Sequence, residues 1–425
     1  MINIGILGLG TVGSGVIKIF QENNELIKKR TGEEVSIKKV LVRDPSKSRA
    51  VKVDNKLLTT DPGEILDDPD IDIVVEVIGG IDPTLDYVLR AIENKKHVVT
   101  ANKEMMAKEG WRILSLAKSR GVDVYYEASV AGGIPIIRPM KESLTANRID
   151  EIIGIINGTT NYILTKMAHE GREYADVLKE AQQLGYAEAD PTSDVEGYDA
   201  RYKLAILATL AFGARIDVMD IYTEGITKIS KIDIKYADEL GYAIKLLAIG
   251  RQRSDGLELR VHPALINKSH PLAQVNDVFN GIFIKGNAIG EIMLYGRGAG
   301  QMPTASAVVA DIIDIIRNIK TGTVNRVESQ YDESIPVIDM NCIVSKYYIR
   351  IRVKDRPGVM ASIAKAFGDH GVSLQSIIQK DVKGEEAEIV LLTHDIMEKC
   401  VSDALVEVRL LPAVVKVENI IREIR

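Results

Sequence analysis

The segment from Glu188 to Lys203, EADPTSDVEGYDARYK, places five acidic side chains immediately before a strongly apolar stretch. Asp199 and Lys203 are four residues apart, so they share one face of a helix. Such a pair is often no more than a surface ion pair. The sequence that follows, LAILATLAF, is apolar nearly all round and is expected to be buried, and burial lowers a lysine pKa toward the range useful for proton transfer. Periodicity alone leaves both interpretations open.

A glycine-rich turn near the N-terminus has the form G-x-G-x-x-G and lies between an expected strand and an expected helix. In this arrangement the first glycine permits a tight turn, the second lets the backbone approach a pyrophosphate, and the third allows close packing of helix on strand. The free N–H groups at the start of the helix then face the anion. A glycine turn without a ligand is the alternative. The pattern predicts a dinucleotide site at Gly8, Gly10, Thr11, Val12 and Gly13.

The end of the second expected strand, Val42-Arg43-Asp44, bears on the choice of dinucleotide. An NAD site usually carries an acidic residue here that binds the ribose hydroxyls, whereas an arginine suits the 2′-phosphate of NADP. Arg43 therefore favours NADP, and Lys47 and Lys52 would add positive charge. Asp44 argues the other way, so NAD stays an alternative.

The composition limits the classes of partner. The 425-residue chain has a net charge of −6 and no long block of lysine and arginine, which argues against nucleic acid or an anionic membrane. The N-terminus lacks the features of a signal peptide, and the longest apolar runs, such as Leu204–Phe212, are too short to span a bilayer. The two cysteines, Cys342 and Cys400, cannot form a disulfide framework. These features predict a cytoplasmic protein that binds neither nucleic acid nor membranes.

Strand-like segments alternate with helical ones at the start of the chain, and this alternation predicts a Rossmann-like, doubly wound parallel sheet. The expected strands are Ile2–Leu7, Val35–Val42, Ile71–Ile78, His97–Thr100 and Val122–Tyr126.

The pattern changes after residue 134. A strand at Ile149–Ile156 precedes helical patterns that extend to about Ile249, and further strands follow, which predicts an α+β domain. From Tyr348 a βαββαβ order indicates a ferredoxin-like module. We therefore predict an α/β protein with an NAD(P)-binding domain at 1–134 plus about 300–320, a substrate-binding, catalytic and dimerisation domain at 135–299, a linker at 321–347 and the ferredoxin-like domain at 348–425.

Several longer strings resemble the homoserine dehydrogenase family over residues 1–318. They are GLGTVGSGV (8–16), VVTANKE (98–104), EASVAGGIPIIRPM (127–140), GIINGTTNYIL (154–164), GYAEADPTSDVEGYDARYKLAILA (185–208) and GRGAGQMPTASAVVADI (296–312). The tail from Tyr348, with Asp355-Arg356-Pro357-Gly358, resembles an ACT domain, an amino-acid-sensing module.

The resemblance implies reversible, NAD(P)-dependent oxidation of L-homoserine to L-aspartate 4-semialdehyde, on the route to threonine, methionine and isoleucine. By position, Lys203 corresponds to the family's proton donor and acceptor, and Lys103 to a lysine that faces cofactor and substrate. The residues implied to hold homoserine are Gly185, Glu188, Asp194 and Asp199. Further implied cofactor contacts are Gly79, Thr100, Lys103, Gly185 and Gly300.

The family also carries a monovalent cation, usually Na⁺, and its ligands map to Glu127, Val130, Gly132 and Ile134. A carboxylate that caps a glycine turn is the alternative for this segment. The ACT resemblance implies an amino-acid effector, expected to be L-threonine, and a homo-oligomer, either a dimer or a tetramer. A module that only joins subunits is the alternative. The expected effector site comprises Asp355, Pro357, Gly358, Gly371 and Val372.

Three other functions are alternatives for this sequence. An aldehyde-oxidising dehydrogenase needs a cysteine nucleophile, and both cysteines fall after the expected catalytic region. A 2-hydroxy-acid dehydrogenase does not fit the central motifs. A non-enzymatic NADP-binding sensor remains the rival from another class, because the acids before Lys203 would then be surface charge only.

Overall fold

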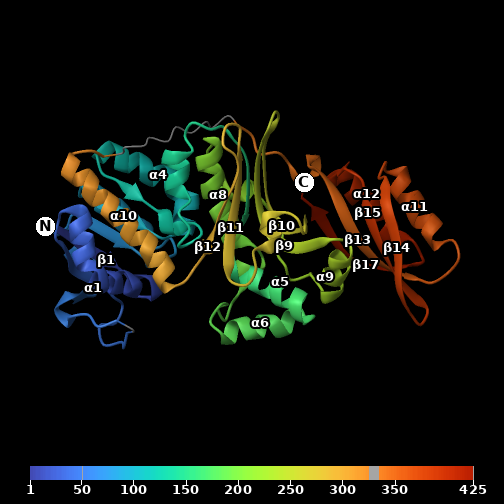
Figure 1. The fold of residues 1–425 in the computed structure, drawn as a ribbon, viewed down its shortest axis with the longest axis horizontal. Helices are drawn as coiled ribbons and strands as arrows, with labels where there is room; N and C mark the ends of the chain where they lie inside the picture. Colours follow the sequence, from blue (N-terminus) through green and yellow to red (C-terminus); the bar gives the residue numbers. More distant parts are fainter. Residues whose placement is uncertain (50, 325–334, 425) are drawn as a thin grey trace. The chain divides into compact units, whose positions relative to one another are not determined.

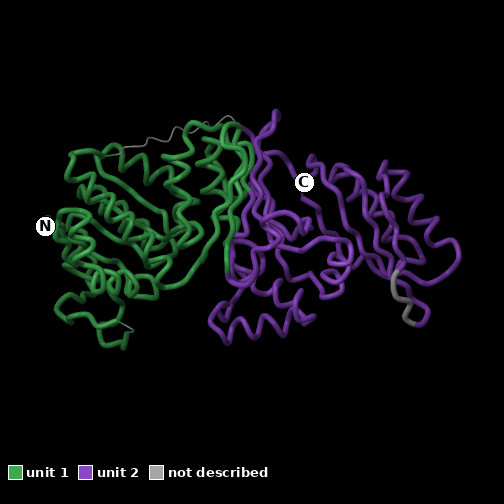
Figure 2. Tube along the Cα trace, viewed as in Figure 1, with its two compact units in different colours: residues 1–152, 199–219, 279–334 green, residues 153–198, 220–278, 335–425 purple. Residues whose placement is uncertain are grey.

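The computed structural model describes residues 1–49, 51–324 and 335–424. The chain forms two compact units, shown in Figures 1 and 2. Unit 1 comprises Met1–Ile152, Asp199–Met219 and Phe279–Ser334, and unit 2 comprises Ile153–Tyr198, Asp220–Val278 and Ile335–Arg425. Part of the predicted linker, residues 325–334, lies outside the described residues.

Unit 1 begins with a parallel sheet of strand order β3-β2-β1-β4-β5-β6, which confirms the predicted Rossmann-like fold. Its strands are short and apolar, and β4 is buried along its whole length, as expected for a sheet covered on both faces. Their bounds are β1 Ile2–Leu7, β2 Val35–Leu41, β3 Leu58–Thr59, β4 Ile73–Glu76, β5 His97–Thr100 and β6 Val124–Tyr125.

The helices of this sheet are α1 (Thr11–Thr31), α2 (Gly63–Leu66), α3 (Thr84–Glu93), α4 (Lys103–Arg120) and α10 (Gln301–Thr321). Figure 1 shows α10 lying along α1, and both helices contribute to one apolar core with β1 and β4. An added Cβ at Gly15 of α1 would lie 2.7 Å from the carbonyl oxygen of Gln301, so a glycine is required where these helices meet. The chain thus returns to the nucleotide-binding sheet after residue 300.

The remainder of unit 1 contains a buried helix and a hairpin. Helix α8 (Tyr198–Phe212) is apolar nearly all round and has most of its residues buried, as its composition predicts. The hairpin pairs β11 (Phe279–Gly286) with β12 (Gly290–Arg297). The first segment of unit 1 ends at Ile152, within β7 (Ile149–Ile155). Two short helical turns, η2 (Glu127–Ser129) and the π-helical η3 (Pro139–Ser143), precede β7.

Unit 2 contains an antiparallel pair that the sequence did not predict in full. Helical patterns were expected to extend to about Ile249, but β9 (Tyr242–Arg253) is a strand and pairs with β10 (Gly256–Asn267) along its whole length. The stretch from Ile244 to Gly250 is buried on both faces, so it lacks the alternation that marks a half-buried strand. The other elements of this part are α5 (Gly158–Glu170), α6 (Tyr174–Gln183), α7 (Thr192–Val195), β8 (Tyr222–Thr223) and α9 (Lys231–Glu239).

The C-terminal part of unit 2 has the predicted βαββαβ order, with α11 and α12 sharing one apolar core with the sheet (Figure 1). Its sheet has the order β17-β13-β15-β14, and β13 begins at Val344, four residues before the expected start at Tyr348. Strand β17 also pairs in parallel with β10, where Arg422 lies opposite Ala264. The bounds are β13 Val344–Lys354, α11 Val359–Asp369, β14 Leu374–Lys383, β15 Glu386–Thr393, β16 Ile396–Met397, α12 Glu398–Leu410 and β17 Val414–Glu423.

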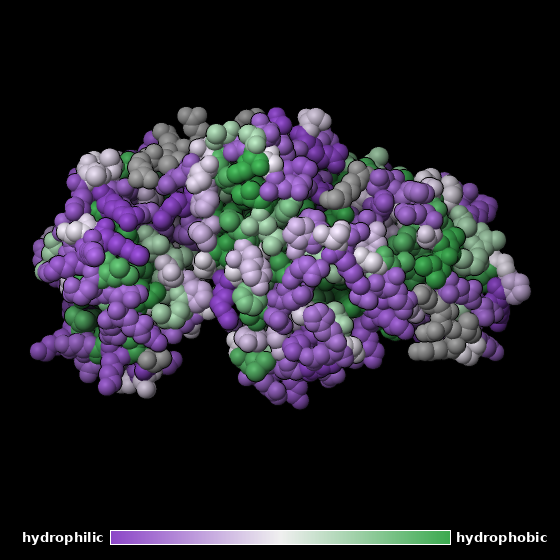
Figure 3. Space-filling view, viewed as in Figure 1, coloured by the Kyte–Doolittle hydropathy of each residue, from purple (hydrophilic) through white to green (hydrophobic). Residues whose placement is uncertain are grey.

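The face drawn in Figure 3 is mostly hydrophilic and carries several apolar patches. One of these patches lies over the C-terminal module. Within the described part of the chain, no helix is both long enough and apolar enough to cross a membrane.

Candidate active site

A cleft of about 710 Å³ in unit 1 lies where β1, β2 and β4 end. Its lining includes Gly8, Gly10, Thr11 and Arg43, which are four of the residues predicted to bind the dinucleotide. In sheets of this type, ligands bind beyond the carboxyl ends of the strands, at the point where the strand order reverses. The cleft therefore has the position expected for a dinucleotide.

The glycines of the turn have the geometry that a pyrophosphate site needs. Gly8 has a φ of +106°, and a Cβ on Gly13 would lie 2.3 Å from the carbonyl oxygen of Gly8. A Cβ on Gly10 would meet nothing within 4 Å, so the backbone faces open space there. Helix α1 has neither a side-chain cap nor an acidic residue in its first turn, which includes Val12, so its N-terminus is suited to an anion. These residues fit a dinucleotide.

Arg43 and Asp44 differ in how they are held. Arg43 is exposed at the cleft. The Asp44 carboxylate accepts hydrogen bonds from the Ser46 hydroxyl at 2.6 Å and from the Ser46 N–H at 2.8 Å, and these bonds lower the pKa of Asp44. Because these bonds keep the carboxylate ionised, Asp44 retains its negative charge beside the cleft and still argues against a 2′-phosphate, as in the sequence.

A buried carboxylate that the sequence analysis missed organises the neighbouring loop. Glu76, at the end of β4, accepts hydrogen bonds from the N–H groups of Ile78 (2.8 Å) and Gly79 (3.0 Å) and from the hydroxyl of Thr100. Burial raises the pKa of Glu76, and these donors oppose the rise. Two predicted cofactor contacts, Gly79 and Thr100, are thereby brought together. A charged residue within the apolar string IVVEVIGG was the available signal.

The structure brings three predicted residues of unit 1 into one cluster. Asp199 is 2% exposed, and its two carboxylate oxygens lie 2.6 Å from the ammonium nitrogens of Lys103 and Lys203, one oxygen to each. Lys103 opens α4, where the Asn102 side chain caps the helix by accepting from the N–H of Met105 at 3.1 Å. Asp199 and Lys203 lie one turn apart on α8. The pair is therefore not a surface ion pair.

The electrostatics of the cluster favour an ionised carboxylate. Burial acts to raise the pKa of Asp199, but the ammonium groups of Lys203 and Lys103 outweigh it and hold this pKa well below its ordinary value. Lys203 is 8% exposed, while the Lys103 side chain is more open to solvent. The cluster thus carries two positive charges against one negative charge, which leaves a cationic environment for a polar substrate atom.

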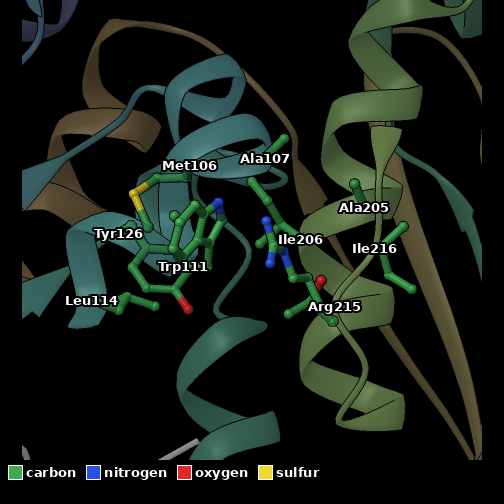
Figure 4. Close-up of a pocket in the computed structure, with 11 residues that line it drawn as sticks. Met106, Ala107, Trp111, Leu114, Tyr126, Ala205, Ile206, Arg215 and Ile216 are labelled. Carbon is green, nitrogen blue, oxygen red and sulfur yellow. The ribbon is translucent and has the colours of Figure 1, made fainter. Parts of the chain in front are cut away.

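The two helices that carry the lysines also face each other through apolar residues further along their length. Figure 4 shows this contact, where Met106, Ala107 and Trp111 of α4 lie beside Ala205 and Ile206 of α8 around a cavity of about 40 Å³. The Arg215 guanidinium lies over the Trp111 ring, 4.3 Å from its centroid. Side chains of α4 and α8 therefore surround one cavity, in addition to the ion pair between Lys103 and Asp199.

Three further predicted substrate residues lie in unit 2. Gly185 follows α6 with a φ of +75°, and Glu188 is exposed. Asp194 lies in α7, and its carboxylate accepts a hydrogen bond of 2.7 Å from the amide nitrogen of Asn157, which caps α5. Asn157 was not singled out from the sequence, although it lies within the quoted string GIINGTTNYIL.

The segment predicted to bind a cation forms a tight, buried turn in unit 1. The Glu127 carboxylate accepts hydrogen bonds from the N–H groups of Ile136 (2.6 Å), Ile137 (2.8 Å) and Arg138 (2.8 Å). A carboxylate offers about four acceptor positions, so one is left after these three bonds. Gly132 has a φ of +52°, and a Cβ there would lie 2.5 Å from the carbonyl oxygen of Gly298. Val130 and Ile134, the other predicted ligands, are buried in the same turn.

A second carboxylate lies beside this turn. Asp311 of α10 accepts a hydrogen bond of 2.9 Å from the Glu127 N–H and pairs with Arg138. Burial, together with the charge of Glu127, raises the pKa of Asp311 to about 8. No group of three or more histidine, cysteine, aspartate or glutamate side chains suited to a metal occurs among the described residues, so any cation here depends on main-chain oxygens.

The last predicted positions lie at helix ends. Gly300 precedes α10 with a φ of +116°. In the C-terminal module, Asp355, Pro357 and Gly358 precede α11, whereas Gly371 and Val372 follow it. The eleven residues of α11 separate these two groups by about 16 Å at 1.5 Å per residue. One copy of the module therefore does not gather the predicted effector residues into a single site.

A dinucleotide-binding sheet combined with a buried lysine–carboxylate cluster defines a nicotinamide-dependent oxidoreductase, in which the cofactor exchanges hydride and the protein moves the proton. Comparison with known proteins agrees. The family model described as homoserine dehydrogenase, NAD binding domain, matches residues 8–127, the homoserine dehydrogenase model matches 135–313, and the ACT domain model matches 347–405.

Individual relatives match over nearly the whole chain. A homoserine dehydrogenase of Bacillus subtilis (strain 168) is 46% identical over 99% of this chain and 98% of the relative. The crystal structure of a homoserine dehydrogenase from Thiobacillus denitrificans superposes with a TM-score of 0.94 at 46% identity and covers 100% of this chain and 98% of that chain. A hyperthermophilic archaeal homoserine dehydrogenase in complex with NADPH gives a TM-score of 0.63 at 28% identity, covering 74% of this chain and 97% of its own. The chain belongs to the homoserine dehydrogenase family and carries a C-terminal ACT domain.

Proposed function

We propose that this enzyme oxidises L-homoserine to L-aspartate 4-semialdehyde with Lys203 as the group that accepts and returns the proton of the substrate hydroxyl. The observation that carries the proposal is the buried cluster in which Asp199 lies 2.6 Å from both Lys103 and Lys203. Asp199 holds both lysine nitrogens in place, and proton transfer needs a group fixed within hydrogen-bond reach of the substrate. In the oxidation Lys203 accepts the hydroxyl proton as the neutral amine, and in the reduction it returns the proton as the ammonium.

Each residue of the cluster has a separate task in this proposal. Lys203 faces the reacting hydroxyl, and Asp199 orients its amine. When Lys203 is the neutral amine, only Lys103 opposes the charge of Asp199, and the carboxylate then also binds the substrate ammonium. Lys103 balances the charge of Asp199 and faces both cofactor and substrate. Glu188 and Asp194 of unit 2 are proposed to bind homoserine through their carboxylates. When bound, the nicotinamide supplies the hydride acceptor.

The cofactor is proposed to be NADP. The support is the exposed Arg43 in the cleft, whose lining also includes Lys47. A guanidinium binds a phosphate through charge-assisted bonds that the ribose hydroxyl of NAD does not offer. The structure of the archaeal relative is a complex with NADPH.

A monovalent cation, Na⁺, is proposed at the Glu127 turn. Glu127 keeps an acceptor position, and the nearby Asp311 adds a second buried carboxylate. Main-chain oxygens of Val130, Gly132 and Ile134 would complete a set of hard ligands. A cation there would offset the repulsion between the Glu127 and Asp311 carboxylates, which the ion pair of Asp311 with Arg138 offsets only in part.

L-Threonine is proposed as the effector of the ACT domain in a cytoplasmic homo-oligomer that serves threonine, methionine and isoleucine biosynthesis. The support is the separation of the predicted effector residues by α11, because a neighbouring ACT domain would be needed to bring the two groups together. Titration of threonine against the intact enzyme, followed by calorimetry and initial rates, tests this. Absence of binding would refute the threonine assignment, and binding without a kinetic effect would refute its regulatory role.

The experiment for the catalytic proposal is homoserine-dependent reduction of NADP by the purified enzyme, repeated with a Lys203→Ala variant. We expect the wild type to form reduced cofactor and the variant to lose this activity while retaining its thermal unfolding transition. Undiminished turnover by the variant would remove Lys203 from the mechanism.

A further inference from the structure

The last strand of the ACT domain places a buried arginine beside the part of unit 2 that carries the predicted substrate-binding residues. Arg422 of β17 is 6% exposed and binds Glu398 of α12 with two hydrogen bonds of 2.6 and 2.7 Å. Its remaining guanidinium nitrogen donates to Glu224 at 2.9 Å. The Arg422 guanidinium also lies 5.1 Å from the centroid of the Tyr222 ring, and the Tyr222 hydroxyl donates to Glu224 at 3.0 Å. Glu224 is thus held from the ACT side.

The residues next to Glu224 pack against the segment that carries Asp194. The N–H of Ile226 donates to the carbonyl oxygen of Val195 at 2.8 Å, and the hydroxyl of Thr227 donates to Glu196 at 3.2 Å. A Cβ on Gly225 would lie 2.2 Å from that same carbonyl oxygen. The backbones of the two segments are therefore in direct contact.

The contact is anchored on the other side by the sheet. The N–H of Glu224 donates to the carbonyl oxygen of Val261 in β10 at 2.8 Å, and β8 pairs in parallel with β10. Gly197 has a φ of +82°, and a Cβ added there would lie 3.2 Å from the Thr223 side chain and 3.3 Å from the Val261 side chain. Residues 222–227 therefore lie as a wedge between the sheet and residues 195–197, and the hydrogen bond from Arg422 to Glu224 holds this wedge in place.

We infer that Arg422 and Glu224 are positioning residues for the substrate-binding segment, so that the ACT domain supplies part of the support of the homoserine site. This inference rests on the proposed role of Asp194 and Glu188 in binding homoserine. The route has three steps: Arg422 holds Glu224, the wedge of residues 222–227 presses on Val195 and Glu196, and these residues adjoin Asp194. Neither Arg422 nor Glu224 needs to touch the substrate.

The test is the separation of KM for homoserine from KM for NADP and from kcat. Glu224→Gln keeps the shape of the side chain and removes the charge that binds Arg422, while Arg422 retains Glu398. A positional effect transmitted through packing typically corresponds to about 2- to 30-fold in affinity. We expect KM for homoserine to rise within this range while kcat and KM for NADP stay close to wild type.

A matched control and a second variant make the result specific. Glu388→Gln removes a comparable ion pair on the same ACT sheet, with Arg350 at 3.2 Å, and does not adjoin residues 195–197. It should leave KM for homoserine unchanged. Gly225→Ala drives a methyl group into the Val195 carbonyl from the opposite end of the route and should reproduce the rise.

Three outcomes would overturn the inference. They are an unchanged KM for homoserine in Glu224→Gln, an equal rise in the Glu388→Gln control, and an unchanged KM for homoserine in Gly225→Ala. Failure of the proposed function has a different signature, because the wild-type enzyme would then not oxidise homoserine, or Asp194→Asn would leave KM for homoserine unchanged.

Discussion

Replacement of Lys203 by methionine removes the amine and keeps the packing of the side-chain stem beside Asp199. General acid–base catalysis contributes about 10²- to 10⁴-fold, which corresponds to about 3 to 5 kcal/mol of transition-state stabilisation at 1.36 kcal/mol per decade. We expect kcat for homoserine oxidation to fall by this factor. The effect should persist at saturating homoserine, because the loss lies in the chemical step.

The structure also predicts the cost to folding. Removal of one partner from a buried ion pair usually costs about 3 to 5 kcal/mol, because it strands a buried charge. Here Asp199 keeps Lys103 at 2.6 Å, so the charge is not stranded. The loss should be about 1.5 to 3 kcal/mol, as for a lost hydrogen bond to a charged group. The folded enzyme should therefore remain the dominant species.

The assay pairs steady-state rates with thermal unfolding of the same samples. Lys166→Met is the matched control, since Lys166 forms an i,i+4 ion pair with Glu170 at 2.7 Å on the exposed side of α5. This control should retain wild-type kcat. A Lys203→Met enzyme within about threefold of wild-type kcat, well short of the general acid–base range, would refute the reasoning.

Three further predictions concern the cofactor, the buried loop and pH. Arg43→Ala should raise the KM for NADP much more than the KM for NAD, because only NADP carries the 2′-phosphate. Initial rates with each cofactor measure this, and equal increases in the two KM values would show that Arg43 does not bind that phosphate. Glu76→Ala should raise the KM for the cofactor and lower thermal stability, because the N–H groups of the loop lose their acceptor at a cost of about 1 to 3 kcal/mol each. Glu76→Gln keeps an acceptor and should have smaller effects; equal effects of the two variants would argue against an acceptor role. Burial holds the pKa of His262 well below 6.5, so the unfolded chain binds a proton that the folded chain excludes, and stability should fall by up to about 1.4 kcal/mol per unit as pH drops below 6.5. His262→Gln should flatten the denaturant-measured pH dependence, and replacement of the exposed His169 should not; parallel curves for wild type and His262→Gln would contradict the assignment.

Local sequence patterns were sufficient to predict much of the fold and part of the candidate site. The turn from Gly8 to Gly13 and the alternation of strands and helices were sufficient for the parallel sheet, because both signals are short-range. The spacing of Asp199 and Lys203 placed them on one helix face, and the apolar residues after Lys203 indicated burial. β9 was misassigned because a strand buried on both faces lacks alternation.

Long-range contacts could not be derived in this way. Lys103 meets Asp199 across 96 residues of chain, and only the family resemblance suggested that Lys103 belongs to the site. Glu76 and Arg422 were not singled out, since a single charged residue in a strand does not reveal its partner. Burial on its own is readable from composition, whereas the identity of a buried ion pair depends on tertiary packing.

The most direct measurement of the central claim is the initial rate of L-homoserine oxidation by the wild-type enzyme, followed through formation of reduced nicotinamide. We predict that reduced NADP forms in a one-to-one ratio with L-aspartate 4-semialdehyde and that the reaction runs backward when semialdehyde and NADPH are supplied. An enzyme that binds NADPH, retains the native fold and yet forms no reduced cofactor with homoserine would contradict the account.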